Sequence, residues 1–310
     1  MLCTNHHYYV EPKHLHRFAK TTPSVFFYGH SSIETNKDLY LQQCHALSKL
    51  IDSRLLSTQM RSTDFPGYIT KDETHPIPKE LINKTKHAGV FIDTPGELCT
   101  MTDNIDVIEQ ICTAFKVNVI LVVDNDPLHA QLLQHRPFMT LNAGIAISRI
   151  PKLLGTIIRT QEERLWRQKY TIQCYFRGEK GKYQSFQQPL NLKEMLVYST
   201  LPVLSVPLSA LPLGTADEYK LQQAQRLDQL HYKDLKINTI IALSFGTEEG
   251  VLATTPVAGF LHCQALPNQD DPVKSIQAPI AYCLVPNQTL PHHLKHCLMG
   301  TIVWNDAQGY

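Results

Sequence analysis

Residues 117–127 read VNVILVVDNDP. The first seven of them are apolar except for Asn118, as in a strand of a parallel sheet whose two faces are both covered by helices. Asp124, Asn125 and Asp126 then end the strand, and Pro127 suits the first turn of a helix that runs to about Gln134. The stretch therefore predicts a buried β-strand that leads directly into a helix.

The same alternation of strand and helix continues on both sides of this stretch. Further strands are predicted over Val25–Tyr28, Gly89–Ile92 and Gly144–Ile150. Helices are predicted after Asn36, which suits a helix N-cap, over Ile105–Phe115 and over the charged segment Ile158–Tyr170. The polar segment Ser57–Lys86 is predicted as a surface excursion. This alternation predicts right-handed crossovers and an α/β fold with a mostly parallel, doubly wound sheet.

The pattern changes after Gly178. Prolines 202, 207 and 212 punctuate a loop-like stretch. Short apolar runs typical of strands follow at Ile237–Phe245, Val257–Cys263, Ile280–Val285 and Leu298–Val303. We therefore expect two domains: an α/β domain over residues 1–186 and a small β-rich, α+β domain over residues 187–310.

Composition excludes several classes of protein. Of the 310 residues, 43% are hydrophobic and 18% are charged, and the formal net charge of +1 excludes a nucleic-acid binder that works by charge alone. The eight cysteines form no Cys-x-x-Cys pair, which favours reduced intracellular thiols over a structural zinc site. The longest apolar run is far shorter than the ~20 residues of a membrane span.

Ligands of doubly wound sheets bind beyond the carboxyl ends of the strands. The candidate ligand-binding residues there are Ser31, Ser32, Asp93, Thr94 and Asp124. Asp93-Thr94-Pro95-Gly96 is also the sequence that GTPases use in their second switch, but a GTPase needs a phosphate loop upstream and an Asn-Lys-x-Asp motif downstream. Asn36-Lys37-Asp38 has the wrong order and spacing for that motif, so the GTPase interpretation is not favoured.

The phosphate-loop motif Gly-x-x-x-x-Gly-Lys-Ser/Thr does not occur in the sequence. The nearest match, Gly178–Lys182, lacks the first glycine at the required distance and has Tyr183 where a metal-binding hydroxyl belongs, so we interpret it as a turn. Without the cradle of backbone N–H groups and its lysine, these residues have nothing to hold the β- and γ-phosphates.

Histidines are concentrated near the two ends of the chain. They are His6, His7, His14 and His16 in the first part, and His292, His293 and His296 beside Cys297 in the last. A metal site needs ligands on a common face with supporting partners, and we interpret these histidines as surface residues rather than as ligands. The motif Gly-x-Ser-x-Gly is missing, so no Ser-His-Asp catalytic triad is predicted.

The charged segment Ile158–Tyr170 carries Arg159, Arg164 and Arg167. One interpretation is an exposed helix whose arginines pair with Glu162 and Glu163. The other is an arginine lid that closes over phosphates, for which guanidinium groups are well suited. The sequence leaves both open.

Taken together, these stretches resemble the polyribonucleotide 5′-hydroxyl-kinase family, which includes the kinase-like subunit of pre-mRNA cleavage and polyadenylation factors. The matching stretches keep their order over nearly the whole chain: Phe27–Ser32 with Asn36 and Leu39-Tyr40, Ile92–Gly96, Val119–Asp124, Arg159–Arg167, Cys174–Gly178, Leu211–Gly214, Gly246–Gly250, Val257–Phe260 and Leu290-Pro291. The Gly-Thr-Glu-Glu and Val-Ala-Gly-Phe runs make the sequence most similar to the cleavage-factor branch.

The resemblance implies three parts: an N-terminal β domain, a central P-loop kinase domain and a C-terminal domain. It implies that this chain begins inside the central domain, so that the family's N-terminal domain and P-loop lie outside the sequence. Two positions depart from the family pattern. Asp93 replaces an asparagine, and Glu97 replaces a tryptophan that could stack an RNA base for roughly 1–3 kcal/mol. The arginine helix carries over as the family's lid, with Arg159 and Arg164 as its best candidates.

The resemblance implies a nuclear subunit of the mRNA 3′-end cleavage and polyadenylation machinery that acts as a catalytically degenerate scaffold. The expected partners are other subunits of that machinery, binding to RNA is left open, and no association with a membrane is expected. ATP and Mg²⁺ are implied by resemblance alone. The alternative is an ATP-dependent polyribonucleotide 5′-hydroxyl kinase, if the missing P-loop is encoded upstream or supplied in trans. Without the strand that carries the phosphate loop, a parallel sheet exposes an apolar face or edge, so we expect the isolated chain to be poorly soluble or tightly partnered.

Overall fold

The computed structural model describes residues 2–3, 24–56, 89–101, 104–135, 144–157, 159–178, 185–202, 227–266, 280–286 and 294–305. The predicted excursion Ser57–Lys86, the candidate turn after Gly178 and most of the terminal histidines lie outside these ranges. Within them, no helix combines the length and the apolar character needed to cross a membrane. The two predicted domains remain a prediction, because one core cluster contains residues from both.

The α/β part contains a pair of parallel strands, β3 (Val119–Val123) and β4 (Ala146–Ile150), joined through helix α5 (Asp126–Gln134). The prediction of a strand leading into a helix is confirmed, with Asn125 as N-cap and Pro127 in the first turn. Helix α4 (Asn104–Phe115) and α5 share a small core with β3, formed by Cys112, Val122, Leu128 and Leu132. This arrangement confirms the α/β class.

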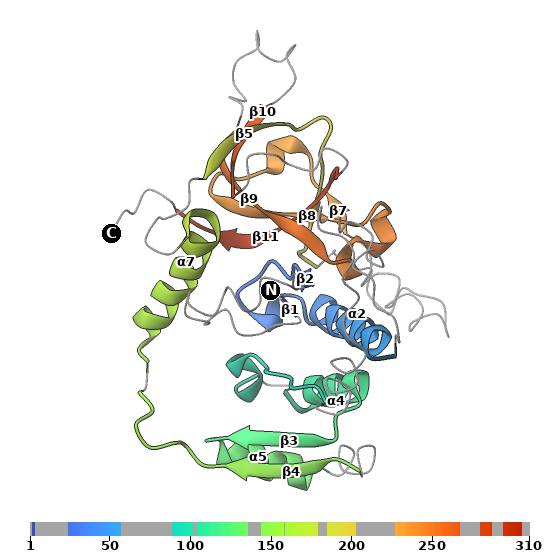
Figure 1. Ribbon diagram of the computed structural model, residues 1–310, viewed down its shortest axis with the longest axis vertical. Coiled ribbons are helices and arrows are strands. Elements are labelled where there is room, and N and C mark those ends of the chain that lie inside the picture. Colours follow the sequence, from blue (N-terminus) through green and yellow to red (C-terminus); the bar gives the residue numbers. More distant parts are fainter. Residues whose placement is uncertain are drawn as a thin grey trace, which may run out of the picture.

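A second layer lies between this unit and the C-terminal sheet (Figure 1). It contains the antiparallel pair β1 (Leu2–Cys3) and β2 (Val25–Phe26), the 3-10 turn η1 (Ile33–Thr35) and helix α2 (Lys37–Leu56), which packs against α4. Asn36 caps α2 as predicted, because its side-chain oxygen accepts a hydrogen bond from the Leu39 amide at 3.1 Å.

The C-terminal part is a seven-stranded sheet in the order β5-β10-β9-β8-β11-β6-β7. Its strands are β5 (Phe186–Asn191), β6 (Leu196–Ser199), β7 (Asp228–Gln229), β8 (Thr239–Ser244), β9 (Val257–Ala265), β10 (Ile280–Val285) and β11 (His296–Val303), with 3-10 turns η6 (Tyr232–Asp234) and η7 (Glu249–Thr254). Only β11 and β6 pair in parallel. The four predicted strands are confirmed as β8 to β11.

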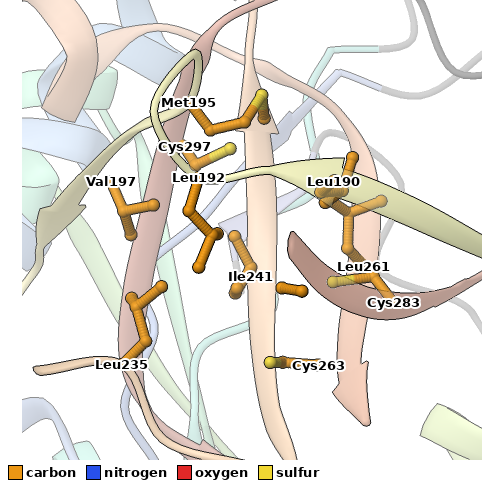
Figure 2. Close-up of a pocket in the computed structure, with 11 residues that line it drawn as sticks. Leu190, Leu192, Met195, Val197, Leu235, Ile241, Leu261, Cys263, Cys283 and Cys297 are labelled. Carbon is orange, nitrogen blue, oxygen red and sulfur yellow. The ribbon is translucent and has the colours of Figure 1, made fainter. Parts of the chain in front are cut away.

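Apolar side chains and thiols fill one side of this sheet (Figure 2). The space among them has room for about one water molecule, so it is core and not a ligand pocket. Cys263 and Cys283 face each other across β9 and β10, and burial raises the pKa of the nearby Cys297 thiol to about 12. The seven cysteines whose side chains the structure describes are free thiols, and of these Cys99 is exposed.

Three local predictions are wrong. Gly89–Ile92 is extended but forms no strand, because no neighbour within the described ranges pairs with it. The β3 strand is not covered on both faces, since Val119, Leu121 and Val123 are each more than half exposed. The charged helix α7 spans Gln161–Arg177 rather than Ile158–Tyr170, because Thr160 caps it in a reciprocal pair with Glu163.

Candidate functional site

Glu97 brings together two of the predicted strand-end segments. It lies in the 3-10 turn η3 (Gly96–Cys99), directly after Asp93–Gly96. One carboxylate oxygen accepts a hydrogen bond from the Ser32 hydroxyl, and the other accepts one from the Ile33 amide at 2.9 Å. The carboxylate therefore satisfies two donors at the start of η1 and links η3 to η1.

Tyr28 fixes the same loop from inside. Its hydroxyl lies 3.0 Å from the Ser32 carbonyl and 2.9 Å from the Ile33 carbonyl, and accepts a hydrogen bond from the Asn36 amide at 3.0 Å. Burial raises the pKa of this phenol to about 12, so it stays protonated and can donate. Of the two candidate serines, Ser32 is thus part of an internal network, whereas Ser31 is exposed.

His30 faces the C-terminal sheet. Its Nε2 lies 2.9 Å from the Thr200 carbonyl oxygen and its Nδ1 lies 3.0 Å from the Thr301 hydroxyl. The neutral ring with its proton on Nε2 satisfies both contacts, since Nδ1 then accepts from Thr301. Asn36 donates to the same Thr200 carbonyl at 2.9 Å. The loop that contains His30 and Asn36 therefore joins the α/β part to the C-terminal sheet.

The burial of His30 predicts a loss of stability in acid. Burial lowers the pKa of its imidazole below the ordinary 6.5, so the folded protein holds the neutral ring. A group whose pKa is lower in the folded state than in the unfolded state contributes its full stabilisation above about pH 6.5, its unfolded pKa. That stabilisation is lost as the pH falls through the folded pKa. We expect the free energy of unfolding, measured by urea titration, to fall less between pH 7.5 and pH 5 in His30→Gln than in the wild type. The variant of the exposed His45, His45→Gln, should keep the wild-type pH dependence; equal slopes in all three proteins would refute this role.

The other strand-end candidates lie at the surface. Asp93 and Thr94 are exposed. Asp124 follows β3 with a positive φ of 52° and forms an ion pair with Lys152 at 3.5 Å, while the neighbouring Asp126 pairs with Arg149 at 2.7 Å. Both ion pairs tie the carboxyl end of β3 to β4 and the segment after it. The structure does not bring Asp124 together with Ser32.

Helix α7 lies away from α2 and α4 (Figure 1) and carries the exposed Arg164 and the half-buried Arg167, while the exposed Arg159 lies just before the helix. The Arg164 guanidinium donates to the Arg159 carbonyl at 3.2 Å, and Glu163 is engaged in the N-terminal cap. The helix is anchored at its other end, where Phe176 stacks on Trp304 with ring centroids 5.4 Å apart. Arg164 and Arg167 thus lie on a helix that is held mainly at its C-terminal turn, with Arg159 just before it, and both interpretations of this segment stay open.

The residues present do not fit a Mg²⁺–ATP site. The sequence has no phosphate loop, and the Glu97 carboxylate already takes the Ser32 hydroxyl and the Ile33 amide. A carboxylate at that place also repels phosphate. Within the described ranges, no three histidine, cysteine, aspartate or glutamate side chains are grouped closely enough to hold a metal ion.

The sequence patterns did not predict the roles of two residues in this region, Glu97 and His30. The structural role of Glu97 depends on a partner 65 residues away, and the contacts of His30 involve partners 170 and 271 residues away. Spacing within a helix or strand reports only neighbours on the same element, so no local signal marks either residue.

Comparisons with known proteins match the resemblance drawn from the sequence. Residues 72–178 match the family described as mRNA cleavage and polyadenylation factor CLP1 P-loop. The chain is 26% identical over 283 residues to the CLP1 homologue of Dictyostelium discoideum, covering 91% of this chain and 53% of that protein. It is 25% identical to the mRNA cleavage and polyadenylation factor clp1 of Botryotinia fuckeliana, covering 63% of this chain and 42% of that protein.

The fold matches as well. The structure of a wild-type Clp1p–Pcf11p complex contains a chain that aligns with 91% of this one at a TM-score of 0.63 and 18% identity, over 56% of that chain. The present chain therefore spans about half the length of the relatives it matches. In sequence it is similar to CLP1 mRNA cleavage and polyadenylation factors, and in fold it is similar to the Clp1p chain of that complex.

Proposed function

We propose that the chain is a subunit of the machinery that cleaves and polyadenylates pre-mRNA 3′ ends, and that it acts in the nucleus. The observation that carries this proposal is the similarity to CLP1 proteins over 91% of the chain. The match of residues 72–178 to the CLP1 P-loop family and the fold similarity to the Clp1p chain both support this proposal.

The proposed role is that of a protein-binding scaffold. The related Clp1p forms a complex with Pcf11p, so a partner of the Pcf11p kind is the first to expect for this chain. RNA is a second proposed partner, reached within the assembly, because a net charge of +1 gives the chain little electrostatic attraction of its own for RNA. The exposed apolar residues of β3 also indicate that the chain binds other proteins.

We propose that the chain does not transfer phosphate by itself. Family resemblance implies ATP and Mg²⁺, but the sequence contains no phosphate loop, and the Glu97 carboxylate is already bonded to the Ser32 hydroxyl and the Ile33 amide. The alternative function, an ATP-dependent polyribonucleotide 5′-hydroxyl kinase, requires a P-loop from outside these residues. One observation favours it: Arg164 on α7 and Arg159 just before this helix are exposed, as an arginine lid needs.

Two measurements on the purified chain distinguish the scaffold from the kinase. Transfer of labelled γ-phosphate to an RNA with a free 5′-hydroxyl is expected to stay at the level of a reaction without protein. A Pcf11p homologue from the same organism is expected to co-purify with the chain in gel filtration. Phosphate transfer that is lost in Arg164→Ala would overturn the scaffold proposal in favour of the kinase. Failure of the Pcf11p homologue to bind would contradict the proposed partner.

A further inference from the structure

Two buried thiols lie opposite each other in the C-terminal sheet, within the apolar cluster of Figure 2. Cys263 on β9 and Cys283 on β10 are paired residues of an antiparallel ladder, and both are fully buried. Opposed residues in such a ladder have Cα atoms about 4.5 to 5.5 Å apart. Disulfides join Cα atoms roughly 4.4 to 6.8 Å apart, so the backbone already holds this pair at a distance that a disulfide can bridge.

The two thiols also interact with each other. The Cys283 thiol donates a hydrogen bond to the Cys263 sulfur, and this bond lowers the pKa of Cys263 although burial acts in the other direction. The same hydrogen bond, together with burial, raises the pKa of Cys283. The thiolate is the form of cysteine that reacts with oxidants. Cys263 is therefore the thiol that reacts first, and Cys283 lies where a second thiol is needed to complete a disulfide.

The third thiol of the cluster has no such neighbour in its ladder. Cys297 on β11 is paired with Leu243 on β8 and with Val197 on β6. Burial raises its pKa to about 12, so this thiol stays protonated at neutral pH. A buried, protonated cysteine behaves as a small apolar side chain. Cys297 thus provides a reference thiol in the same core.

The strand that carries Cys283 is held weakly on both sides. The register between β9 and β10 shifts beside Cys283, which leaves Gln264 as an extra residue in β9. On the other side, Tyr282 is opposite Pro189 of the edge strand β5, and proline has no N–H group to donate. Interruptions of this kind favour brief local opening of the sheet edge. Hydrogen peroxide is small and uncharged, so it can reach the pair through such openings.

We infer that Cys263 and Cys283 form a reversible disulfide between β9 and β10 when the protein meets hydrogen peroxide. The Cys263 thiol gives up its proton and its sulfur attacks one peroxide oxygen, so the O–O bond breaks and a sulfenic acid and one water form. The Cys283 sulfur then attacks the Cys263 sulfur. An S–S bond forms, the S–O bond breaks, and the hydroxide leaves with the Cys283 proton as a second water.

The disulfide changes the stability of the sheet. It joins β9 to β10 covalently and restricts the unfolded chain between residues 263 and 283, so the oxidised protein resists unfolding more than the reduced protein. A thiol such as dithiothreitol reverses the reaction by exchange. This inference depends only on the C-terminal sheet, and its failure would leave the proposed function unchanged.

Peptide mapping of the peroxide-treated full chain tests the inference. The wild type is expected to yield two peptides, one with Cys263 and one with Cys283, joined by a disulfide that dithiothreitol removes. Cys297→Ala is the matched control, because it removes a thiol from the same core but not from the pair, and it should yield the same joined peptides. Cys263→Ala should yield none.

Urea unfolding gives a second readout, in which each protein is compared with and without peroxide so that the cost of the substitution cancels. The wild type and Cys297→Ala are expected to unfold at a higher urea concentration after peroxide treatment, whereas Cys263→Ala should not shift. Three results in the treated wild type would each overturn the inference: Cys263 and Cys283 both still reduced, either of them joined to Cys297 instead, or both oxidised to sulfonic acids without a disulfide.

Discussion

Gly300→Ala is expected to lower the free energy of unfolding by about 3 kcal/mol, because the added methyl group would overlap neighbouring backbone atoms. A Cβ at this position would overlap the carbonyl group and Cα of Gly29, closer than van der Waals contact allows. Both are backbone atoms, and the Thr301 amide donates to the same Gly29 carbonyl at 2.8 Å. To relieve this steric overlap, the loop that carries His30 would have to move away from β11.

Urea unfolding followed by tryptophan fluorescence measures this loss, since Trp304 lies four residues further along the chain. Gly250→Ala is the control, because a methyl group added at Gly250 would have no atom of a more distant residue within 4 Å. Its stability should stay within about 0.5 kcal/mol of the wild type. A Gly300→Ala protein as stable as Gly250→Ala would show that the close approach of loop and sheet does not exist in solution.

Phe176→Ala is expected to cost about 3 to 5 kcal/mol, the usual range for removing a buried aromatic side chain. Phe176 is 1% exposed and stacks on Trp304, while the neighbouring Tyr175 hydroxyl accepts a hydrogen bond from the Phe260 amide at 3.0 Å. These contacts fasten the last turn of α7 to the C-terminal sheet. Losing them should free the helix that carries the arginines as well as weaken the core.

Thermal unfolding and limited proteolysis check this prediction together. Phe176→Ala should melt at a lower temperature and be cleaved within α7 more rapidly than the wild type. Leu165→Ala removes an apolar side chain from the same helix where it is 49% exposed, and should change neither result. If Leu165→Ala proved as damaging as Phe176→Ala, α7 would have to be packed along its whole length rather than at one end.

Local patterns were sufficient for elements whose signals lie within themselves. The cap at Asn36, Pro127 in the first turn of α5 and the apolar runs of β8 to β11 each depend on neighbours in sequence, and each is confirmed. Strands β5 and β6 were not predicted. The β5 strand contains Pro189 and two glutamines on an edge of the sheet, and β6 is only four residues long, so neither gives a strong strand pattern.

Patterns failed where the outcome depends on what lies beside an element. The apolar run of Gly89–Ile92 resembles a strand, but a strand needs a partner to hydrogen-bond with, and periodicity cannot reveal whether one is present. The same reasoning applies to β3, whose composition suits a strand covered on both faces although one face is exposed. Glu97 shows a related limit, because the sequence marks it as a departure from the family but not as the partner of Ser32.

The central claim, that the chain is a working part of the 3′-end processing machinery, is tested most directly by a cleavage assay. Nuclear extract of the source organism is depleted of the chain with an antibody and supplied with a pre-mRNA that carries a polyadenylation site. Cleavage at that site is expected to fall to background and to return when the purified chain is added back. Undiminished cleavage by the depleted extract would contradict the claim.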